Sequence, residues 1–192
     1  MAGRLSRRLA AVLLLLLPAA CSSGPDPTLY TMAAQPGIVV HATKSRSIEM
    51  RRVGLAGYLD RPGLVRATTP YRLVVTDMAR WGEPLSRMIE RVTIENLLMR
   101  LPDASVYSES GGLSMQPDTI LEIDMQRLDV DVTGDVVLVA QVAVRHDGTR
   151  IPPASRTIRI TQHPASNSND DVVAAMSTAM AQLADEIARM IR

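Results

Sequence analysis

The spacing of apolar residues changes twice along this chain of 192 residues. Between about Pro84 and Leu101 they recur every three or four positions, which predicts a helix with one buried face. From Val106 onward they alternate with polar residues, which is typical of half-buried strands. The spacing of three and four returns from about Asp170 to Ile191 and predicts a second long helix.

Turn-forming residues separate the alternating segments and set how the strands pair. Thr133-Gly134-Asp135 and His146-Asp147-Gly148 predict two tight turns, and therefore neighbouring antiparallel strands. Leu29–Met32, the alternating segment at Ile48 and Met50, and Tyr71–Val75 predict shorter strands. The glycine- and proline-rich stretch 54–63 predicts a loop. We therefore predict a single α+β domain, with a mainly antiparallel sheet and both long helices packed on one face.

The first 20 residues have the pattern of an export signal. Arg4, Arg7 and Arg8 precede the apolar run Leu9–Leu17, and small residues lead to Cys21. The run is much shorter than the roughly 20 residues that a membrane-spanning helix needs. We assign 1–20 to the signal peptide, 21–28 to the mature terminus and a flexible tether, and 29–192 to the folded domain.

Cys21 is the single cysteine of the chain and stands where the signal ends. The arrangement resembles the lipobox of bacterial lipoproteins, and this resemblance implies that Cys21 is acylated and becomes the mature N-terminus. The alternative is a secreted protein cut near Ala20 that carries a free thiol. No intramolecular disulfide can form, so the domain must be held by core burial.

Charge and composition disfavour several function classes. Without the three arginines of the signal, the 21 basic residues fall to 18 against 20 acidic ones, so there is no basic field for nucleic acid. His41, His146 and His163 lack the spacing of metal ligands, and no nucleotide-binding or nucleophile motif occurs. The pairs Glu122/Asp124 and Asp129/Asp131 are interpreted as solvent-facing strand residues. We therefore expect no enzyme, no metal and no cofactor other than the covalent lipid.

Five residues in proline- and glycine-rich segments are candidates for a partner-binding surface: Tyr58, Asp60, Arg61, Trp81 and Glu83. Tyrosine, tryptophan and arginine are enriched at protein contacts, and loops carry function more often than strands do. In the alternative interpretation, Trp81 packs over the start of the first helix and Tyr58 closes its loop against the sheet.

The same region carries a resemblance to a known family. Leu29-Tyr30-Thr31-Met32, Tyr58-Leu59-Asp60-Arg61-Pro62, Arg72-Leu73-Val74 and Arg80-Trp81-Gly82-Glu83-Pro84-Leu85 are similar to the PqiC/YmbA-like auxiliary lipoproteins of MCE-type ABC transport systems. Asn96-Leu97 in the following helix fits as well.

This resemblance implies a lipoprotein that works beside an MCE-domain protein, a permease and an ATPase in lipid transport across the periplasm. Ser22 after Cys21 implies sorting to the periplasmic face of the outer membrane. The leading hypothesis is thus an accessory docking component of such a system. The alternative is a lipid carrier that holds an acyl chain between the sheet and the helices. A homo-oligomer through the last helix also remains open, because its spacing suits a helix–helix seam as well as packing on a sheet.

Overall fold

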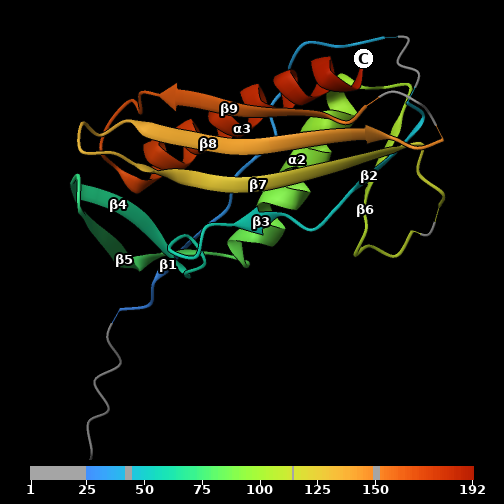
Figure 1. Ribbon diagram of the computed structural model, residues 1–192. Helices are drawn as coiled ribbons and strands as arrows, with labels where there is room; N and C mark the ends of the chain where they lie inside the picture. Colours follow the sequence, from blue (N-terminus) through green and yellow to red (C-terminus); the bar gives the residue numbers. More distant parts are fainter. Residues whose placement is uncertain (1–24, 42–44, 114, 149–151) are drawn as a thin grey trace, which may run out of the picture.

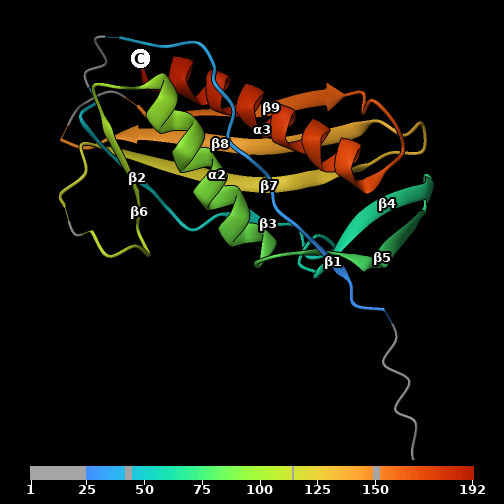
Figure 2. The same cartoon turned by 180° about the vertical axis from the view of Figure 1, so that it is seen from behind.

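The computed structural model describes residues 25–41, 45–113, 115–148 and 152–192. Within them a mixed sheet carries two helices on one of its faces (Figures 1 and 2). The helices are α2 (Leu85–Arg100) and α3 (Asn169–Ile191). The strands are β1 (Thr28–Tyr30), β2 (Ser47–Met50), β3 (Gly54–Leu55), β4 (Gly63–Thr69), β5 (Arg72–Trp81), β6 (Ser105–Ser108), β7 (Thr119–Val130), β8 (Val136–His146) and β9 (Ala154–Gln162). The predicted α+β class is confirmed.

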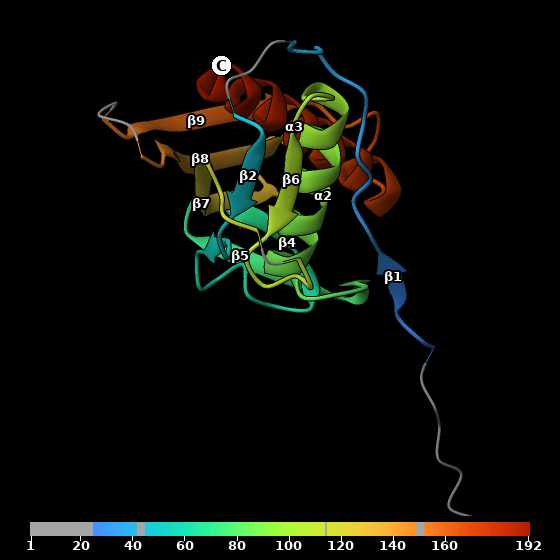
Figure 3. The same ribbon diagram turned by 90° about the vertical axis from the view of Figure 1, so that its right-hand side faces the viewer.

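The centre of the sheet is β7. It pairs antiparallel with β8 along its whole length, and β8 pairs antiparallel with β9. On its other edge β7 pairs in parallel with β2, β3 and β4. Beyond β2 lies β6, and the two strands run side by side at one end of the molecule (Figure 3). The two predicted turns hold Gly134 and Gly148 at φ values of 92° and 65°, a backbone region that suits glycine.

A β-bulge in β7 changes which residues face the helices. The register with β8 shifts between Met125 and Arg127. Ile123 and Met125 face the core before the bulge, and Leu128 and Val130 face it afterwards. The extra residue at the bulge shifts the core-facing positions from odd-numbered to even-numbered residues, and the alternation then continues.

Local sequence signals mark both ends of α2 and the start of α3. Pro84 stands directly before α2, and Pro102 follows its end. At the start of α3 the Ser168 hydroxyl accepts a hydrogen bond of 3.1 Å from the Asp171 amide. α3 lies over β8 and β9 and also packs against α2. Among the described residues, no helix combines the length and the apolar character needed to cross a bilayer.

Two predictions for the region before α2 are wrong. The sequence predicted a loop over 54–63 and a short strand at Tyr71–Val75, whereas β3 occupies Gly54–Leu55, β4 begins at Gly63 and β5 continues to Trp81. Trp81 is therefore the last residue of a strand. Much of the β4–β5 hairpin is exposed and has no single buried face, so apolar alternation is weak there.

Residues 33–41, here called the strap, run in an extended path across the two helices (Figure 2). The Gln35 amide donates to Asn96 Oδ1 of α2 at 3.0 Å, and the Ile38 amide donates to Asp185 Oδ1 of α3 at 3.2 Å. The strap thereby ties the N-terminal part of the domain to both helices.

Candidate functional site

The end of β5 and the start of α2 place Trp81 and Glu83 beside the loop at residues 60–62. The Trp81 amide donates to the carbonyl oxygen of Pro62 at 2.7 Å, and the Gly82 amide donates to that of Tyr30 at 2.8 Å. These bonds hold the loop, β1 and the strand end together before Pro84 starts the helix.

The result is a surface pocket of about 380 Å³, here called the docking pocket. Its lining residues are Asp60, Arg61, Pro62, Trp81, Glu83, Pro84 and Leu85. Trp81 and Leu85 are 7% and 3% exposed, so they form its apolar floor and belong to the core as well. The structure therefore unites four of the five predicted contact residues, from segments about 20 positions apart in the chain.

The charged residues of the docking pocket differ in whether they form ion pairs. Glu83 Oε1 pairs with Arg91 Nη2 at 2.8 Å, and Arg91 also pairs with Glu95 at 3.2 Å. Asp60 and Arg61 are exposed and make no ion pair with any other described residue. One carboxylate and one guanidinium thus remain available beside an apolar floor, an arrangement typical of contact surfaces.

Tyr58 lies apart from the docking pocket. Its hydroxyl donates a 2.6 Å hydrogen bond to Asp129 Oδ2, and Arg127 Nε donates to the other carboxylate oxygen at 2.8 Å. Burial, followed by the bond to Asp129, raises the pKa of Tyr58 well above its usual value. Tyr58 therefore closes its loop against β7, as in the alternative interpretation.

Asp129 corrects the interpretation of the strand carboxylates. Glu122 and Asp124 are exposed, as predicted, but Asp129 is only 2% exposed. Tyr58 and Arg127 satisfy the buried carboxylate, so it is a structural group. Tyr58 and Asp129 lie 71 residues apart, so no local sequence pattern predicts that they pair.

Tyr58→Phe is expected to lower the free energy of unfolding by about 1–3 kcal/mol, because the buried Asp129 carboxylate loses its hydroxyl donor. Urea denaturation measures the change. The matched control is Tyr71→Phe at a fully exposed tyrosine, for which a change below about 0.5 kcal/mol is expected. If Tyr58→Phe changed the free energy of unfolding as little as Tyr71→Phe, the hydrogen bond would contribute nothing to stability.

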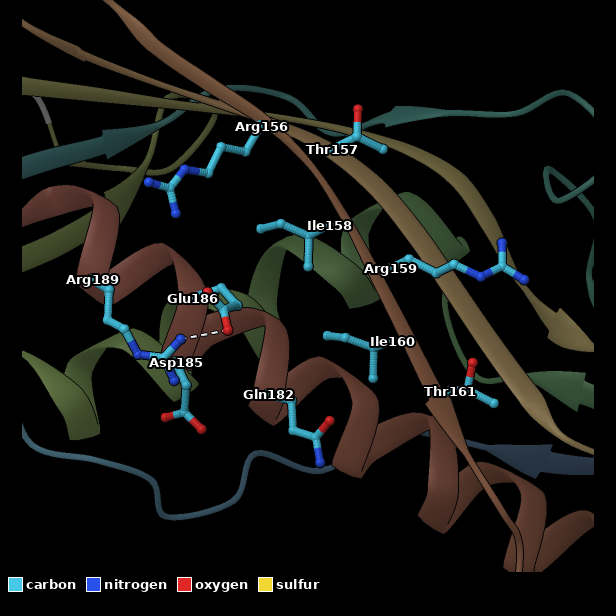
Figure 4. Close-up of a pocket in the computed structure, with 10 residues that line it drawn as sticks. All are labelled: Arg156, Thr157, Ile158, Arg159, Ile160, Thr161, Gln182, Asp185, Glu186 and Arg189. Atoms are coloured by element: carbon cyan, nitrogen blue, oxygen red, sulfur yellow. Dashed lines mark ion pairs between the residues drawn. The ribbon is translucent and has the colours of Figure 1, made fainter.

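A larger groove of about 610 Å³ lies between β9 and α3 (Figure 4). Ile158 and Ile160 point from β9 toward the helix, while Arg159 points away from it. The acidic side chains of the groove are already engaged, because Glu186 pairs with Arg189 and Asp185 with Arg100. The Asp185 pair joins α3 to α2, the Glu186 pair lies within α3, and neither singles out a ligand.

The comparisons with known proteins identify the class of this domain. The chain matches a crystal structure of an uncharacterised protein with a TM-score of 0.74 at 20% identity, over 88% of this chain and 100% of that one. A Xanthomonas campestris protein matches with a TM-score of 0.70 at 22% identity, over 84% and 92% of the two chains. These likenesses establish a shared fold.

Residues 30–188 match the family of ABC-type transport auxiliary lipoprotein components, and the chain belongs to this family, as the resemblance predicted. The intermembrane transport lipoprotein PqiC of Escherichia coli K12 is 25% identical over 177 residues, which cover 91% of each chain. PqiC of Shigella flexneri matches equally. The protein is thus a PqiC-like auxiliary lipoprotein of ABC-type transport.

Proposed function

We propose that this protein is a non-enzymatic docking component of an MCE-type ABC lipid transport system. It receives the MCE-domain protein at the periplasmic face of the outer membrane, while the permease and ATPase act at the inner membrane. Membership of the transport auxiliary family supports this role, as does the similarity to PqiC, whose name describes an intermembrane transport lipoprotein.

The docking pocket is the observation that carries the proposal. Trp81 and Leu85 close its floor with a small exposed apolar area, and Pro62 and Pro84 stiffen the backbone on either side. A stiff rim loses little conformational entropy when a partner binds. Asp60 and Arg61, which form no ion pair within the described part of the chain, supply opposite charges that orient the partner, so the pocket suits a protein segment with an apolar anchor and a flanking charge.

The proposed membrane attachment is an acyl anchor on Cys21. This residue lies outside the described part of the chain, and Thr28, the first residue of β1, follows it by seven positions. Such a tether spans at most about 25 Å, so the domain would work close to the membrane that holds the anchor.

Arg61→Ala is expected to weaken binding of the MCE-domain protein by about 1–2 kcal/mol and to leave the melting temperature unchanged, because Arg61 is exposed and unpaired within the described structure. Binding of the purified lipoprotein to the MCE-domain protein encoded in the same genome is measured by calorimetry. Asp60→Ala tests the second charge.

Arg52→Ala is the matched control, since Arg52 is an exposed arginine outside the docking pocket. It should bind like the wild type. Equal binding by all these variants would place the partner surface elsewhere, with the exposed side of α3 as the next candidate. Native mass spectrometry of the same samples reports the oligomeric state and any stoichiometric bound lipid.

The packing between sheet and helices favours docking over the carrier alternative. Met88 and Leu97 of α2 and Met176 and Met180 of α3 are each at most 1% exposed. They interlock with the apolar face of β7 and β8 in one core cluster. A carrier would have to displace these side chains to admit an acyl chain, at the cost of core packing.

A further inference from the structure

The β4–β5 hairpin presents apolar side chains to solvent at one end of the molecule. Beyond Arg66, which pairs with Val130 of β7, β4 pairs with β5 alone. The hairpin therefore projects from the sheet as a two-stranded ribbon (Figures 1 and 2). The exposed apolar residues at this end are Tyr71, Leu73, Val74 and, in the β7–β8 turn, Val132. We call these four residues the apolar tip.

Three of the four residues of the apolar tip share one surface. Tyr71, Leu73 and Val132 line the same hollow of about 510 Å³, which brings the hairpin and the β7–β8 turn together. Val74 faces the opposite side of the ribbon, because successive strand residues alternate in direction. Each face of the tip therefore exposes at least one apolar side chain, and Tyr71, 98% exposed, stands at its end.

Pro70 and two local hydrogen bonds constrain the backbone at the tip. Pro70 fixes the turn, the Tyr71 amide donates to Thr69 Oγ1 at 3.3 Å, and Thr68 Oγ1 donates to the Arg72 carbonyl oxygen at 3.4 Å. Arg72 itself is exposed and makes no ion pair with another described residue. A stiff apolar tip with an available cation beside it matches the boundary between lipid headgroups and acyl chains.

The length of the tether favours a membrane as the occupant of this surface. β1 pairs with β5 in parallel, with Thr28 opposite Ala79. Tyr71 lies eight positions before Ala79, a rise of about 27 Å along an extended strand. The seven chain steps from Cys21 to Thr28 span at most about 25 Å, close to the length of the hairpin, so an acylated Cys21 and the hairpin tip can reach the same bilayer when the tether is extended beside the hairpin.

We propose that the apolar tip inserts into the surface of the bilayer that holds the acyl anchor and sets the orientation of the domain on that membrane. The proposal rests on the acylation of Cys21 in the proposed function. Insertion is limited to the interfacial region, because β5 pairs with β1 only at residues 79–81 and its outer edge at the tip keeps polar backbone groups that require water. A flat protein surface could cover one face of the ribbon, whereas an interfacial lipid layer covers both.

Spin labels on the acylated mature protein test the insertion. Cys21 is the chain's single cysteine and its thiol is consumed by the lipid, so Tyr71→Cys, Val132→Cys or Thr157→Cys each supplies one thiol for labelling. The protein is bound to vesicles of phosphatidylethanolamine and phosphatidylglycerol, and collisions with oxygen and with a water-soluble nickel chelate are compared. Labels at 71 and 132 should be several-fold better shielded from nickel than the label at 157, an exposed position on β9.

Tyr71→Asp combined with the label at 132 is the second variant. A charge at this exposed position leaves the fold intact and should expose the label at 132 to nickel. Equal nickel access at 71 and 157 in vesicle-bound protein would overturn the insertion and leave the anchor standing. Shielding at 71 that arises only after the MCE-domain protein is added would also overturn it, in favour of a protein interface.

Mass spectrometry of the N-terminal peptide separates failure of the anchor from failure of the tip. A chain without acyl groups on Cys21 would overturn the anchoring and, with it, the inserted tip.

Discussion

Arg100→Met is expected to lower the free energy of unfolding by about 3–5 kcal/mol, because it leaves a network of buried polar groups without its central donor. The Arg100 side chain is 0% exposed, and its Nε lies 2.6 Å from Asp185 Oδ1 of α3. Its Nη1 and Nη2 donate to the carbonyl oxygens of Asn96, Gln35 and Ala181 at 2.9–3.0 Å. Urea denaturation measures the loss.

The same substitution should release the strap from the helices. The guanidinium of Arg100 occupies the space beside Gly37, where an added Cβ would lie 2.0 Å from Nη2. Nη1 of Arg100 also holds the Gln35 carbonyl oxygen, whereas the Val40 amide donates to the backbone carbonyl oxygen of Arg100 at 2.7 Å and can keep this bond in the variant. Amide hydrogen exchange at Gln35 and Ile38 should accelerate more than exchange in the centre of β8.

Arg91→Met is the matched control on the same helix. Arg91 forms ion pairs with Glu83 and Glu95, but its side chain is 39% exposed, so removing it should cost less than about 1 kcal/mol. Equal losses for Arg91→Met and Arg100→Met would contradict the role assigned to the buried network.

Cys21→Ser is expected to abolish membrane anchoring of the protein. Serine provides no thiol for acylation, and each buried methylene contributes about 0.8 kcal/mol to membrane binding, so the loss of two or three acyl chains removes stable attachment. The variant should accumulate as an unprocessed precursor or as a soluble periplasmic protein. Cell fractionation and mass spectrometry of the N-terminal peptide measure the outcome.

Ser23→Ala serves as the control for this experiment, because it leaves Cys21 and the residue after it unchanged. It should be acylated and should fractionate like the wild type. A Cys21→Ser protein that still fractionated with the outer membrane as a normally processed species would disprove the anchor.

The sequence predicts the role of Cys21 more directly than that of Arg100. Cys21 follows an apolar run and small residues, so its pattern is local. Arg100 stands at the end of a helical apolar stripe, where an arginine is usually solvated or placed near the last carbonyl groups. Its partner Asp185 is 85 residues away, and nothing near either residue indicates the pair.

The candidate site shows the same division. The types of Asp60, Arg61, Trp81 and Glu83 marked them as contact residues, and the structure places all four on one pocket. Tyr58 belonged to the same sequence motif, but the hydrogen bond to Asp129 draws it to β7. Residue type indicated which side chains are suited to contacts, whereas long-range pairing decided which of them lie together.

The sequence by itself determined α2, α3 and the antiparallel strands β7 and β8, since their periodicity, capping residues and turns act between residues close along the chain. Only the tertiary structure decided the parallel pairing of β1 with β5, the projecting β4–β5 hairpin and the buried network around Arg100. These features join segments far apart in sequence through backbone hydrogen bonds and buried charges. Their stability comes from exclusion of water in the folded domain, which no local window of residues encodes.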